Sequence, residues 1–223
     1  MKKIKIAIDG PAGSGKTTTA KIVAEKLGYI YIDTGAMYRA VTLAWLRSGR
    51  ELNEEVICEL MNNIEITLKN TSSGQRTYLN QEDVSDDIRL PDVTKHVSPV
   101  SAIGCVREKL VAMQRELAKE GAAVLDGRDI GTVVFPDAEL KIYLIATVES
   151  RAERRTKELR EKNIEFSVEE IKQQISDRDN YDSSRANSPL RKADDAVEID
   201  TSNLTIKQQC DLIIDFAKKI IGE

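Results

Sequence analysis

Eight residues near the start of this chain constrain its fold more than any other feature. Residues 10–17 read GPAGSGKT, a full match to GxxxxGK[ST], between an aliphatic run that ends at Asp9 and a helix-forming run that opens at Lys16. Glycines let backbone N–H groups curl around phosphate oxygens, and a helix N-terminus adds favourable partial charge. In this context the motif predicts a phosphate-binding loop (P-loop) between a strand and a helix, and therefore a nucleoside-triphosphate site.

Two side chains of this loop carry the chemistry that the motif implies. Lys16 is expected to reach the β- and γ-phosphates, and the Thr17 hydroxyl is expected to bind Mg²⁺. A glycine-rich turn with a chance lysine is the alternative, and the strand before it and the helix after it argue against that. The residues expected to bind the nucleotide are Gly10, Pro11, Ala12, Gly13, Ser14, Gly15, Lys16, Thr17 and Thr18.

Beyond the loop, short apolar runs alternate with longer amphipathic stretches. This alternation predicts an α/β fold in which βα units build a parallel sheet, because strands buried on both faces are continuously aliphatic. Strands are expected over residues 4–9, 29–33, 122–126, 140–146 and 196–199. Helices are expected over residues 16–26, 36–48, 101–119, 149–161, 168–181 and 206–220. Capping-box spacing marks two of the helix starts, at Ser167 with Glu170 and at Thr205 with Gln208.

One region, residues 53–97, breaks this rhythm. It reads as a short helix and then two strands, 65–69 and 75–80, around a turn at 70–74, which predicts an antiparallel hairpin. Because the βα pattern resumes afterwards, we expect an inserted α+β subdomain. Residues 151–166 are dense in charge and poor in large apolar side chains, and are expected to form a second, smaller mobile element. The core is expected to comprise residues 1–52, 98–150 and 167–223.

Composition disfavours several classes of protein. The net charge is −4 and aromatic residues make up 4% of the chain, which argues against a nucleic-acid-binding platform. One histidine and three separated cysteines, Cys58, Cys105 and Cys210, predict neither a disulfide framework nor a zinc cluster. The sequence shows no signal-peptide core and no apolar stretch of about 20 residues, the length of a membrane span. We therefore expect a cytoplasmic protein that binds neither nucleic acid nor membrane.

The fate of the γ-phosphate depends on motifs outside the loop. The chain contains no DxxG and no NKxD, which argues against a GTPase. Charged side chains recur instead at helical spacing, in one group at Arg151, Arg154 and Arg155 and in another at Arg178, Asp182 and Arg185. Two like charges about 4 Å apart cost ~4 kcal/mol at an effective dielectric constant of about 20, so bringing an anionic acceptor to a triphosphate requires such cations. These groups indicate a small-molecule kinase. The alternative is a charged helix face exposed to solvent, which explains the first group equally well.

Two further segments follow expected strands. Asp126 leads into Gly127-Arg128-Asp129, and its carboxylate is expected to hold Mg²⁺ directly or through water. Arg128 and Asp129 would then lie at the carboxyl edge of the sheet, where open α/β folds bind ligands. Thr34 and Arg39 follow the second expected strand, and we expect them at the acceptor site. Ordinary turns with capping acids are the alternative for both segments.

These motifs occur in one order along the chain: the loop, DTGAMYR at 33–39, DGRDIGTVVFPDA at 126–138, and Arg178-x3-Asp182-x2-Arg185. Assembled in this order they resemble bacterial members of the cytidylate kinase family over essentially the whole chain. The resemblance implies phosphoryl transfer from MgATP to CMP or dCMP, within pyrimidine nucleotide metabolism. It also implies a five-stranded parallel core, a CMP-binding insertion at 53–97 and an arginine-bearing lid at 151–166.

The resemblance implies roles for individual residues. Positions near the acceptor are matched by Thr34 and Arg39, and positions that hold cytosine are matched by Ser98, Arg107 and Asp129. Arg128 matches a phosphate contact. Positions near the sugar are matched by Arg178 and Asp182, and Arg185 matches a further acceptor position. The groups expected to act in catalysis are Lys16, Asp126, Arg128, Arg151 and Arg155. A carboxylate such as Asp129 can accept from the exocyclic amino group of cytosine and would repel the carbonyl of uracil. The reaction then needs alignment and charge neutralisation, with no covalent enzyme intermediate.

Rival functions stay open on the residues alone. Another small kinase of this class could act on AMP, UMP or shikimate, and a nucleotide-sensing switch would bind partners without transferring phosphate. A nucleic-acid-binding ATPase is opposed by the acidic balance and the sparse aromatic residues. Nothing in the sequence indicates an obligate assembly. We therefore expect a monomer that uses ATP and Mg²⁺ and whose small-molecule partners are CMP and dCMP.

Overall fold

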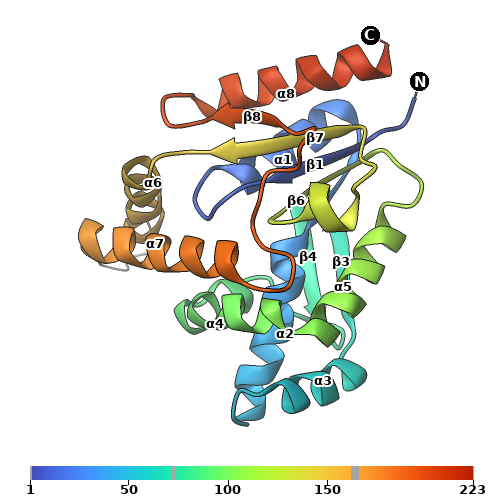
Figure 1. Ribbon diagram of the computed structural model, residues 1–223. Helices are drawn as coiled ribbons and strands as arrows, with labels where there is room; N and C mark the ends of the chain where they lie inside the picture. The colour runs from blue at the N-terminus through green and yellow to red at the C-terminus, as the bar shows by residue number, and fades with distance from the viewer. Residues whose placement is uncertain (1, 72–73, 162–165, 223) are drawn as a thin grey trace. The chain divides into compact units, whose positions relative to one another are not determined.

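The computed structural model describes residues 2–71, 74–161 and 166–222 (Figure 1). Contacts divide the chain into two compact units, which we call the first unit (Met1–Tyr31 with Glu120–Glu223) and the second unit (Ile32–Lys119). Residues 72–73 of the expected 70–74 turn and residues 162–165 of the expected mobile element lie outside the described residues.

The first unit follows the expected alternation of strands and helices. Its elements are β1 (Lys5–Asp9), α1 (Lys16–Leu27), β6 (Ala123–Gly127), η2 (Ile130–Val134), β7 (Leu140–Ile145), α6 (Val148–Arg160), α7 (Val168–Ser184), β8 (Val197–Asp200) and α8 (Ile206–Ile221). Both expected capping boxes are present, one at the start of α7 and one at the start of α8. Each satisfies backbone N–H groups that the first helical turn leaves without partners.

A five-stranded sheet forms the centre of the fold, with the strand order β2-β6-β1-β7-β8, where β2 is Ile30–Asp33. β1 pairs in parallel with both β6 and β7, and β7 pairs in parallel with β8. The expected α/β fold with a five-stranded parallel sheet is confirmed. In such a sheet the strands end at one edge, so Asp9 at the end of β1 lies beside Gly127 at the end of β6.

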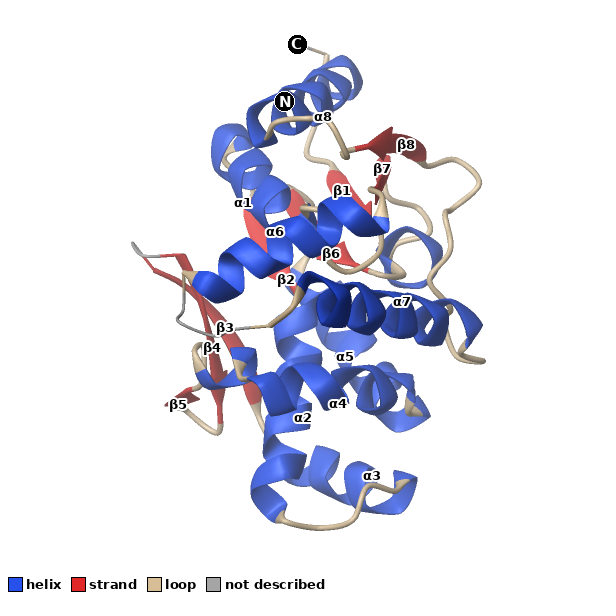
Figure 2. Ribbon diagram, turned by 90° about the vertical axis from the view of Figure 1, so that its left-hand side faces the viewer, coloured by secondary structure: helices blue, strands red, loops and turns tan. Residues whose placement is uncertain are grey.

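Helices α1 and α8 pack together on one face of this sheet (Figure 1). Their contact is built from aliphatic side chains that are fully buried, among them Ile6, Ile8, Val23, Ile142 and Ile213. Helices α6 and α7 lie side by side (Figure 2) and share a smaller apolar cluster around Leu159 and Ile171. That cluster explains why the charged α6 folds as a helix: its few apolar residues occupy one face and pack against α7.

The second unit carries most of the interrupted region. Its elements are α2 (Thr34–Ser48), α3 (Glu54–Asn63), β3 (Ile66–Thr71), β4 (Gly74–Leu79), β5 (Glu82–Asp83), η1 (Asp87–Arg89), α4 (Pro91–Ala102) and α5 (Gly104–Leu117). β3 and β4 form the expected antiparallel hairpin, and β5 adds a short third strand (Figure 2). A single apolar core joins α2 to the helices and hairpin of this unit. The Trp45 ring meets His96 edge-on at 5.4 Å, in keeping with a structural role for both.

Two helices of this unit differ from expectation. The sequence predicts one helix over 101–119, whereas the structure has α4 over Pro91–Ala102 and α5 over Gly104–Leu117, separated at Ile103. Pro99 lies inside α4. A proline in a helical pattern normally signals a helix end, because it lacks an N–H group and clashes with the preceding turn. Burial of Val93, Val97 and Val100 in the core of the second unit outweighs that local signal.

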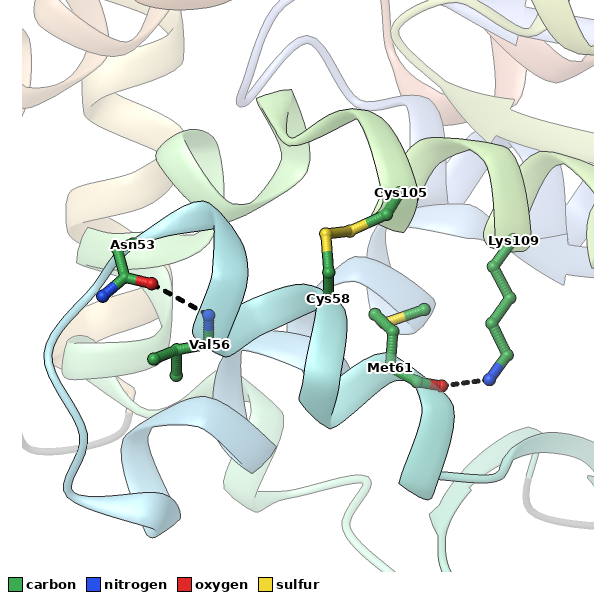
Figure 3. Close-up of a disulfide and its surroundings, with 6 residues drawn as sticks. All are labelled: Asn53, Val56, Cys58, Met61, Cys105 and Lys109. Carbon is green, nitrogen blue, oxygen red and sulfur yellow. Dashed lines mark hydrogen bonds between the residues drawn. A yellow bond between two sulfur atoms is a disulfide. The ribbon is translucent and has the colours of Figure 1, made fainter.

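One disulfide is present where the cysteine spacing predicted none. Cys58 of α3 and Cys105 of α5 are bonded, with their Cα atoms 5.8 Å apart, although 47 positions separate them in sequence (Figure 3). The same two helices are also linked by a hydrogen bond from Lys109 Nζ to the Met61 carbonyl oxygen (Figure 3). The pairing was missed because it depends on how α3 packs against α5, which cysteine spacing does not report. Cys210 is free and buried.

Over the described residues, the structure has no helix with the length and apolar character needed to cross a membrane.

Candidate active site

The phosphate-binding loop connects β1 to α1, as the motif predicts. At Gly10 the backbone φ is +146°, and a Cβ atom there would lie 2.1 Å from the carbonyl oxygen of Leu144, so only glycine fits. Gly15 precedes α1 in a left-handed conformation and makes no side-chain cap. The first turn of α1 therefore presents backbone N–H groups toward the loop, which is the arrangement that binds phosphate. Thr18 is exposed on that turn.

The Lys16 side chain is folded into the loop. Its Nζ donates to the Pro11 carbonyl oxygen at 2.5 Å and to Ser14 Oγ at 3.3 Å, and the residue is 5% exposed. Burial lowers the pKa of Lys16 well below its usual value, and the nearby Arg128 lowers it further. A buried ammonium group with a lowered pKa gains from an anionic ligand, because the ligand restores the charge balance of its surroundings. This is the chemistry expected of the lysine in a nucleotide-binding loop.

Thr17 and Asp126, the two residues expected to bind Mg²⁺, are in direct contact. The Thr17 hydroxyl donates to Asp126 Oδ2 at 2.8 Å, and the Tyr31 hydroxyl donates to Asp126 Oδ1 at 2.6 Å. Asp126 is the penultimate residue of β6, and Thr17 lies in the first turn of α1. A hydroxyl and a carboxylate side by side are hard oxygen donors of the type that Mg²⁺ prefers. The pair therefore fits the ion.

The second arginine group assembles around one buried carboxylate. Asp182 of α7 is 2% exposed; its Oδ2 accepts from Arg128 Nε at 3.0 Å, and it lies 3.8 Å from Arg178 and 4.0 Å from Arg185. Burial would raise the pKa of Asp182, but the three guanidinium groups outweigh it and lower the pKa. Three cations thus share one anion. Burial, followed by Arg128, lowers the pKa of Arg178 to about 10, while Asp182 and Asp179 oppose that shift.

The first arginine group is divided among three environments. Arg151 is 4% exposed and donates to the carbonyl oxygens of Ala146 and Ala12 and to Asp179 Oδ2. Arg154 donates to Thr201, whose hydroxyl in turn donates to the carbonyl oxygen of Ser14. Arg155 makes an exposed pair with Glu158 at 3.0 Å. Arg151 and Arg154 are thus tied to the backbone of the phosphate-binding loop, directly or through Thr201. For all three arginines, contact with a phosphate stays a prediction.

Asp129 lies at the start of the η2 turn. It is 3% exposed, and its side chain does not cap that turn. Arg128, immediately before it, also donates to the carbonyl oxygen of Gly127 at 3.3 Å. The first unit therefore brings together the loop, the Thr17–Asp126 pair and the arginine cluster at the end of β6.

In the second unit, Thr34 and Arg39 both lie on α2. Asp33 caps this helix: its Oδ1 accepts from the Ala36 N–H at 2.8 Å, and its Oδ2 accepts from Arg89 at 2.6 Å. Thr34 is the first residue of α2 and is 2% exposed. Arg39 donates to Thr94 Oγ1 at 2.8 Å and to the Ile88 carbonyl oxygen at 3.2 Å. Arg39 is thus oriented by η1 and α4.

Ser98 and Arg107 are brought together through Ser101. The Ser101 hydroxyl donates to the Ser98 carbonyl oxygen at 2.8 Å, and Arg107 donates to the Ser101 carbonyl oxygen at 3.2 Å. The Arg107 guanidinium group also lies 5.5 Å from the centre of the Tyr38 ring, a cation–π contact. Arg107 is 6% exposed. These contacts hold its guanidinium group in a defined orientation.

Several residues of the first unit that contact the candidate site or support it were missed by sequence reasoning. Tyr31 contacts the Asp126 carboxylate, Thr201 contacts the loop at Ser14, and Gln209 accepts from Thr19 at 2.9 Å. Tyr31 could have been found, since it lies two residues before the end of an expected strand. Thr201 and Gln209 carry no local signal, because Thr201 reaches Ser14 of the loop, and Gln209 reaches Thr19 of α1, from about 190 positions away in sequence.

Comparison with known proteins agrees with these motifs. The model of the family described as Cytidylate kinase matches residues 6–219. A protein of Caldicellulosiruptor saccharolyticus called cytidylate kinase is 51% identical over all 223 residues of this chain, which covers 99% of that protein. A protein of the same name from Bacillus cereus strain B4264 is 48% identical over the same span, again 99% of its length.

A solved structure of an uncharacterised protein from Eubacterium ventriosum has a similar fold. It aligns with a TM-score of 0.52 and 12% identity, over 98% of this chain and 99% of that one. At this identity the likeness concerns the fold alone. The family model and the full-length relatives carry the assignment: this chain belongs to the cytidylate kinase family.

Proposed function

We propose that this protein transfers the γ-phosphoryl group of ATP to CMP or dCMP. The bond between the γ-phosphorus and the oxygen of the β-phosphate breaks, a bond to an oxygen of the CMP phosphate forms, and ADP leaves. The observation that carries the proposal is the full-length similarity to proteins called cytidylate kinase, in a chain that retains the phosphate-binding loop and its Mg²⁺ pair. No covalent enzyme intermediate is needed.

On the donor side, the loop and the start of α1 bind the triphosphate. Lys16 leaves its internal partners, the Pro11 carbonyl oxygen and Ser14 Oγ, and donates to phosphate oxygens. Thr17 and Asp126 hold Mg²⁺, directly or through water; the bound ion supplies positive charge at the β- and γ-phosphate oxygens. Tyr31 keeps Asp126 in place through its 2.6 Å hydrogen bond.

Acceptor recognition is assigned to the residues that match acceptor positions of the family. In the first unit, the buried Asp129 accepts from the exocyclic amino group of cytosine, and Arg178 and Asp182 contact the sugar, with Arg185 beside them. In the second unit, Ser98 and Arg107 contact the base, and Thr34 and Arg39 contact the phosphate end of CMP. A buried carboxylate discriminates strongly against uracil, because it would face a carbonyl oxygen where cytosine offers an amino donor.

Charge neutralisation is assigned to the arginines. Arg128 shares Asp182 with two other guanidinium groups, so it can turn toward a phosphate while Arg178 and Arg185 remain near the carboxylate. Arg151 and Arg155 are proposed to act from the lid. Fixed positive charge around the transferring phosphoryl group lowers the barrier, since it needs no reorganisation during the reaction.

The test is ADP release from MgATP, coupled to a dehydrogenase assay, with CMP, dCMP, UMP, AMP or no acceptor. The proposal expects strong stimulation by CMP and dCMP and little by the others. Stimulation by AMP or UMP alone would identify another monophosphate kinase. No stimulation by any acceptor would overturn the proposal.

Two variants assign the activity to the site. Lys16→Ala should lower turnover with every acceptor by at least about 100-fold, because a group that stabilises developing charge is lost. Asp129→Asn should raise the KM for CMP much more than the KM for ATP. Asp137→Asn is the matched control: it makes the same chemical change at an exposed side chain that pairs with Lys5, and it should behave as wild type.

A further inference from the structure

Asp9 is a buried carboxylate that the reaction described above does not use. It is the last residue of β1, directly before Gly10, and is 5% exposed. Its Oδ1 accepts from the backbone N–H of Ile130 at 2.8 Å, and its Oδ2 accepts from the backbone N–H of Gly131 at 2.7 Å. Both donors lie more than 120 positions away in sequence, immediately after Asp129.

These two bonds give Asp9 the task that a capping residue normally performs. Ile130 and Gly131 open the η2 turn, a π-helical segment over Ile130–Val134, and the first N–H groups of a helical turn have no partner within it. An aspartate at the position of Asp129 would ordinarily accept such groups. Here the Asp129 side chain makes no capping bond, and Asp9 accepts the N–H groups instead. The carboxylate of Asp129 is therefore not committed to its own turn.

The fit between Asp9 and this turn is close. A Cβ atom at Gly131 would lie 3.2 Å from Lys141 Cδ, which is a tight approach, and 3.4 Å from Asp9 Oδ2, which is van der Waals contact, so little free space is left beside the carboxylate. β1 also pairs in parallel with β6, with Asp9 beside Gly127. The segment from Gly127 to Gly131 is thus fixed to the end of β1 at one side by the sheet and at the other by the Asp9 carboxylate.

Burial removes the Asp9 carboxylate from water and so makes its charged form less favourable. Burial, and more weakly the nearby Asp129, raises the pKa of Asp9 to about 7, while the N–H groups of Gly131 and Ile130 and the Lys16 ammonium group lower it. Tyr143 also faces Asp9, and its pKa is raised by burial and by the Asp9 charge. An ionised group in such a place is costly unless its hydrogen bonds are made, so the two N–H donors and the carboxylate depend on each other.

We propose that Asp9 is a positioning residue for acceptor binding: by holding the Ile130 and Gly131 amides, it orients Asp129, and with it Arg128, toward CMP. The inference rests on the proposed function, in which Asp129 accepts from the cytosine amino group. Asp9 itself touches neither substrate. Its effect should fall on the acceptor and on base selectivity, whereas a residue that only supported the phosphate-binding loop would affect ATP.

The variant Asp9→Asn tests this, because it preserves size and turns one of the two acceptors into a donor facing an N–H group. We expect the KM for CMP to rise about tenfold, the effect of one lost buried hydrogen bond. The KM for ATP should stay within about twofold, and the preference for CMP over UMP should narrow. In hydrogen exchange, the amides of Ile130 and Gly131 should exchange faster in the variant. A KM for ATP that rises as much as that for CMP would overturn the proposal, since Asp9 would then act through Lys16.

Three further variants make the outcome decisive. Ile213→Val lowers stability from a fully buried position between α8 and the sheet and should leave the KM for CMP unchanged, which separates positioning from general destabilisation. Gly131→Ala crowds Lys141 Cδ and places a Cβ atom against Asp9 Oδ2, so it should shift the Gly131 amide slightly and repeat the CMP-selective effect to a smaller extent, including when Asp9→Asn does not fold. Asp129→Asn separates the positioning role of Asp9 from the proposed role of Asp129 in binding cytosine. If Asp129→Asn raises the KM for CMP but neither Asp9→Asn nor Gly131→Ala does, the positioning role of Asp9 is wrong and the role of Asp129 stands. If Asp129→Asn leaves the KM for CMP unchanged, the proposed role of Asp129 is wrong.

Discussion

The Thr17 hydroxyl donates a 2.8 Å hydrogen bond to Asp126 Oδ2, which joins the first turn of α1 to the end of β6. The two residues are 109 positions apart in sequence. Tyr31 occupies the other carboxylate oxygen. The two residues proposed to bind Mg²⁺ are therefore held in place by a third residue.

Replacing Asp126 with asparagine should lower kcat with MgATP and CMP by about 100-fold, because the site loses the negative charge that holds the ion. The Mg²⁺ concentration needed for half-maximal rate should rise as well. Steady-state rates over a Mg²⁺ titration measure both. Thr17→Ser keeps the hydroxyl and should stay close to wild type. An Asp126→Asn enzyme with unchanged Mg²⁺ dependence would contradict the assignment.

Asp182→Asn should destabilise the protein and weaken CMP binding together. The change leaves Arg128, Arg178 and Arg185 without their shared carboxylate, and breaking a buried charge pair typically costs about 3–5 kcal/mol of unfolding free energy. Urea unfolding and the KM for CMP are the measurements. Sulfate should restore stability to the variant more than to wild type, because it supplies the missing anion to the three cations.

The control for this variant is Asp177→Asn on the same helix. Asp177 contacts Gln173 at the surface, so its loss should change neither stability nor KM noticeably. If Asp182→Asn were as stable as wild type and insensitive to sulfate, the arginines would have other partners, and the view of the cluster as an anion site would be wrong.

The disulfide should contribute to stability with little effect on turnover. A Cys58–Cys105 bond closes a loop with a sequence separation of 47, for which loop entropy predicts a stabilisation of about 4 kcal/mol. Cys105 lies two residues before Arg107 on α5, but the Lys109–Met61 hydrogen bond still links α3 to α5 after reduction. Thermal unfolding with and without reductant should therefore differ by several degrees, while the KM for CMP stays within about twofold.

The double variant Cys58→Ser with Cys105→Ser is the control for the reductant itself. Its melting temperature should match that of the reduced wild type and should not respond to further reductant. Equal melting temperatures for oxidised and reduced wild type would mean that the bond adds no stability.

The fold was largely predictable because the first unit is built from local signals. Its strands are continuously aliphatic runs, and its helices begin at recognisable caps such as Ser167 and Thr205, so most expected ends fall within one or two residues of those observed. The second unit was less predictable. α4 contains Pro99, and the disulfide depends on how α3 meets α5. In both cases packing within the unit decides the outcome, and the local sequence does not report it.

The residues of the candidate site also fall into those that local motifs predict and those that they do not. Lys16, Thr17 and Asp126 were expected from contiguous motifs, and the structure brings Thr17 and Asp126 into contact. Tyr31 was missed although its place near the end of an expected strand could have revealed it, whereas Thr201 was not predictable, because a single side chain that reaches a motif from a distant part of the chain leaves no pattern in sequence.

The stability of the protein should depend on pH through Asp9. Burial raises the pKa of this carboxyl from 3.8 to about 7, so between these values the folded chain keeps a proton that the unfolded chain has lost. Protonation then favours folding: the contribution is fully present below about pH 4, declines as pH rises, and is lost above about pH 7. Each unit of pKa shift corresponds to about 1.4 kcal/mol, so the change should amount to a few kcal/mol at most.

Asp9→Asn isolates this contribution, since asparagine does not titrate. Denaturant unfolding of both proteins at pH 5 and pH 8 should show wild type losing stability relative to the variant as pH rises. The groups facing Asp9, namely Asp129, Lys16 and Tyr143, are retained in the variant, so the comparison cancels their own titration to first order. If the difference between the two proteins were the same at both pH values, Asp9 would titrate in its usual range. The two N–H bonds from Ile130 and Gly131 would then be strong enough to cancel the whole cost of burying its charge.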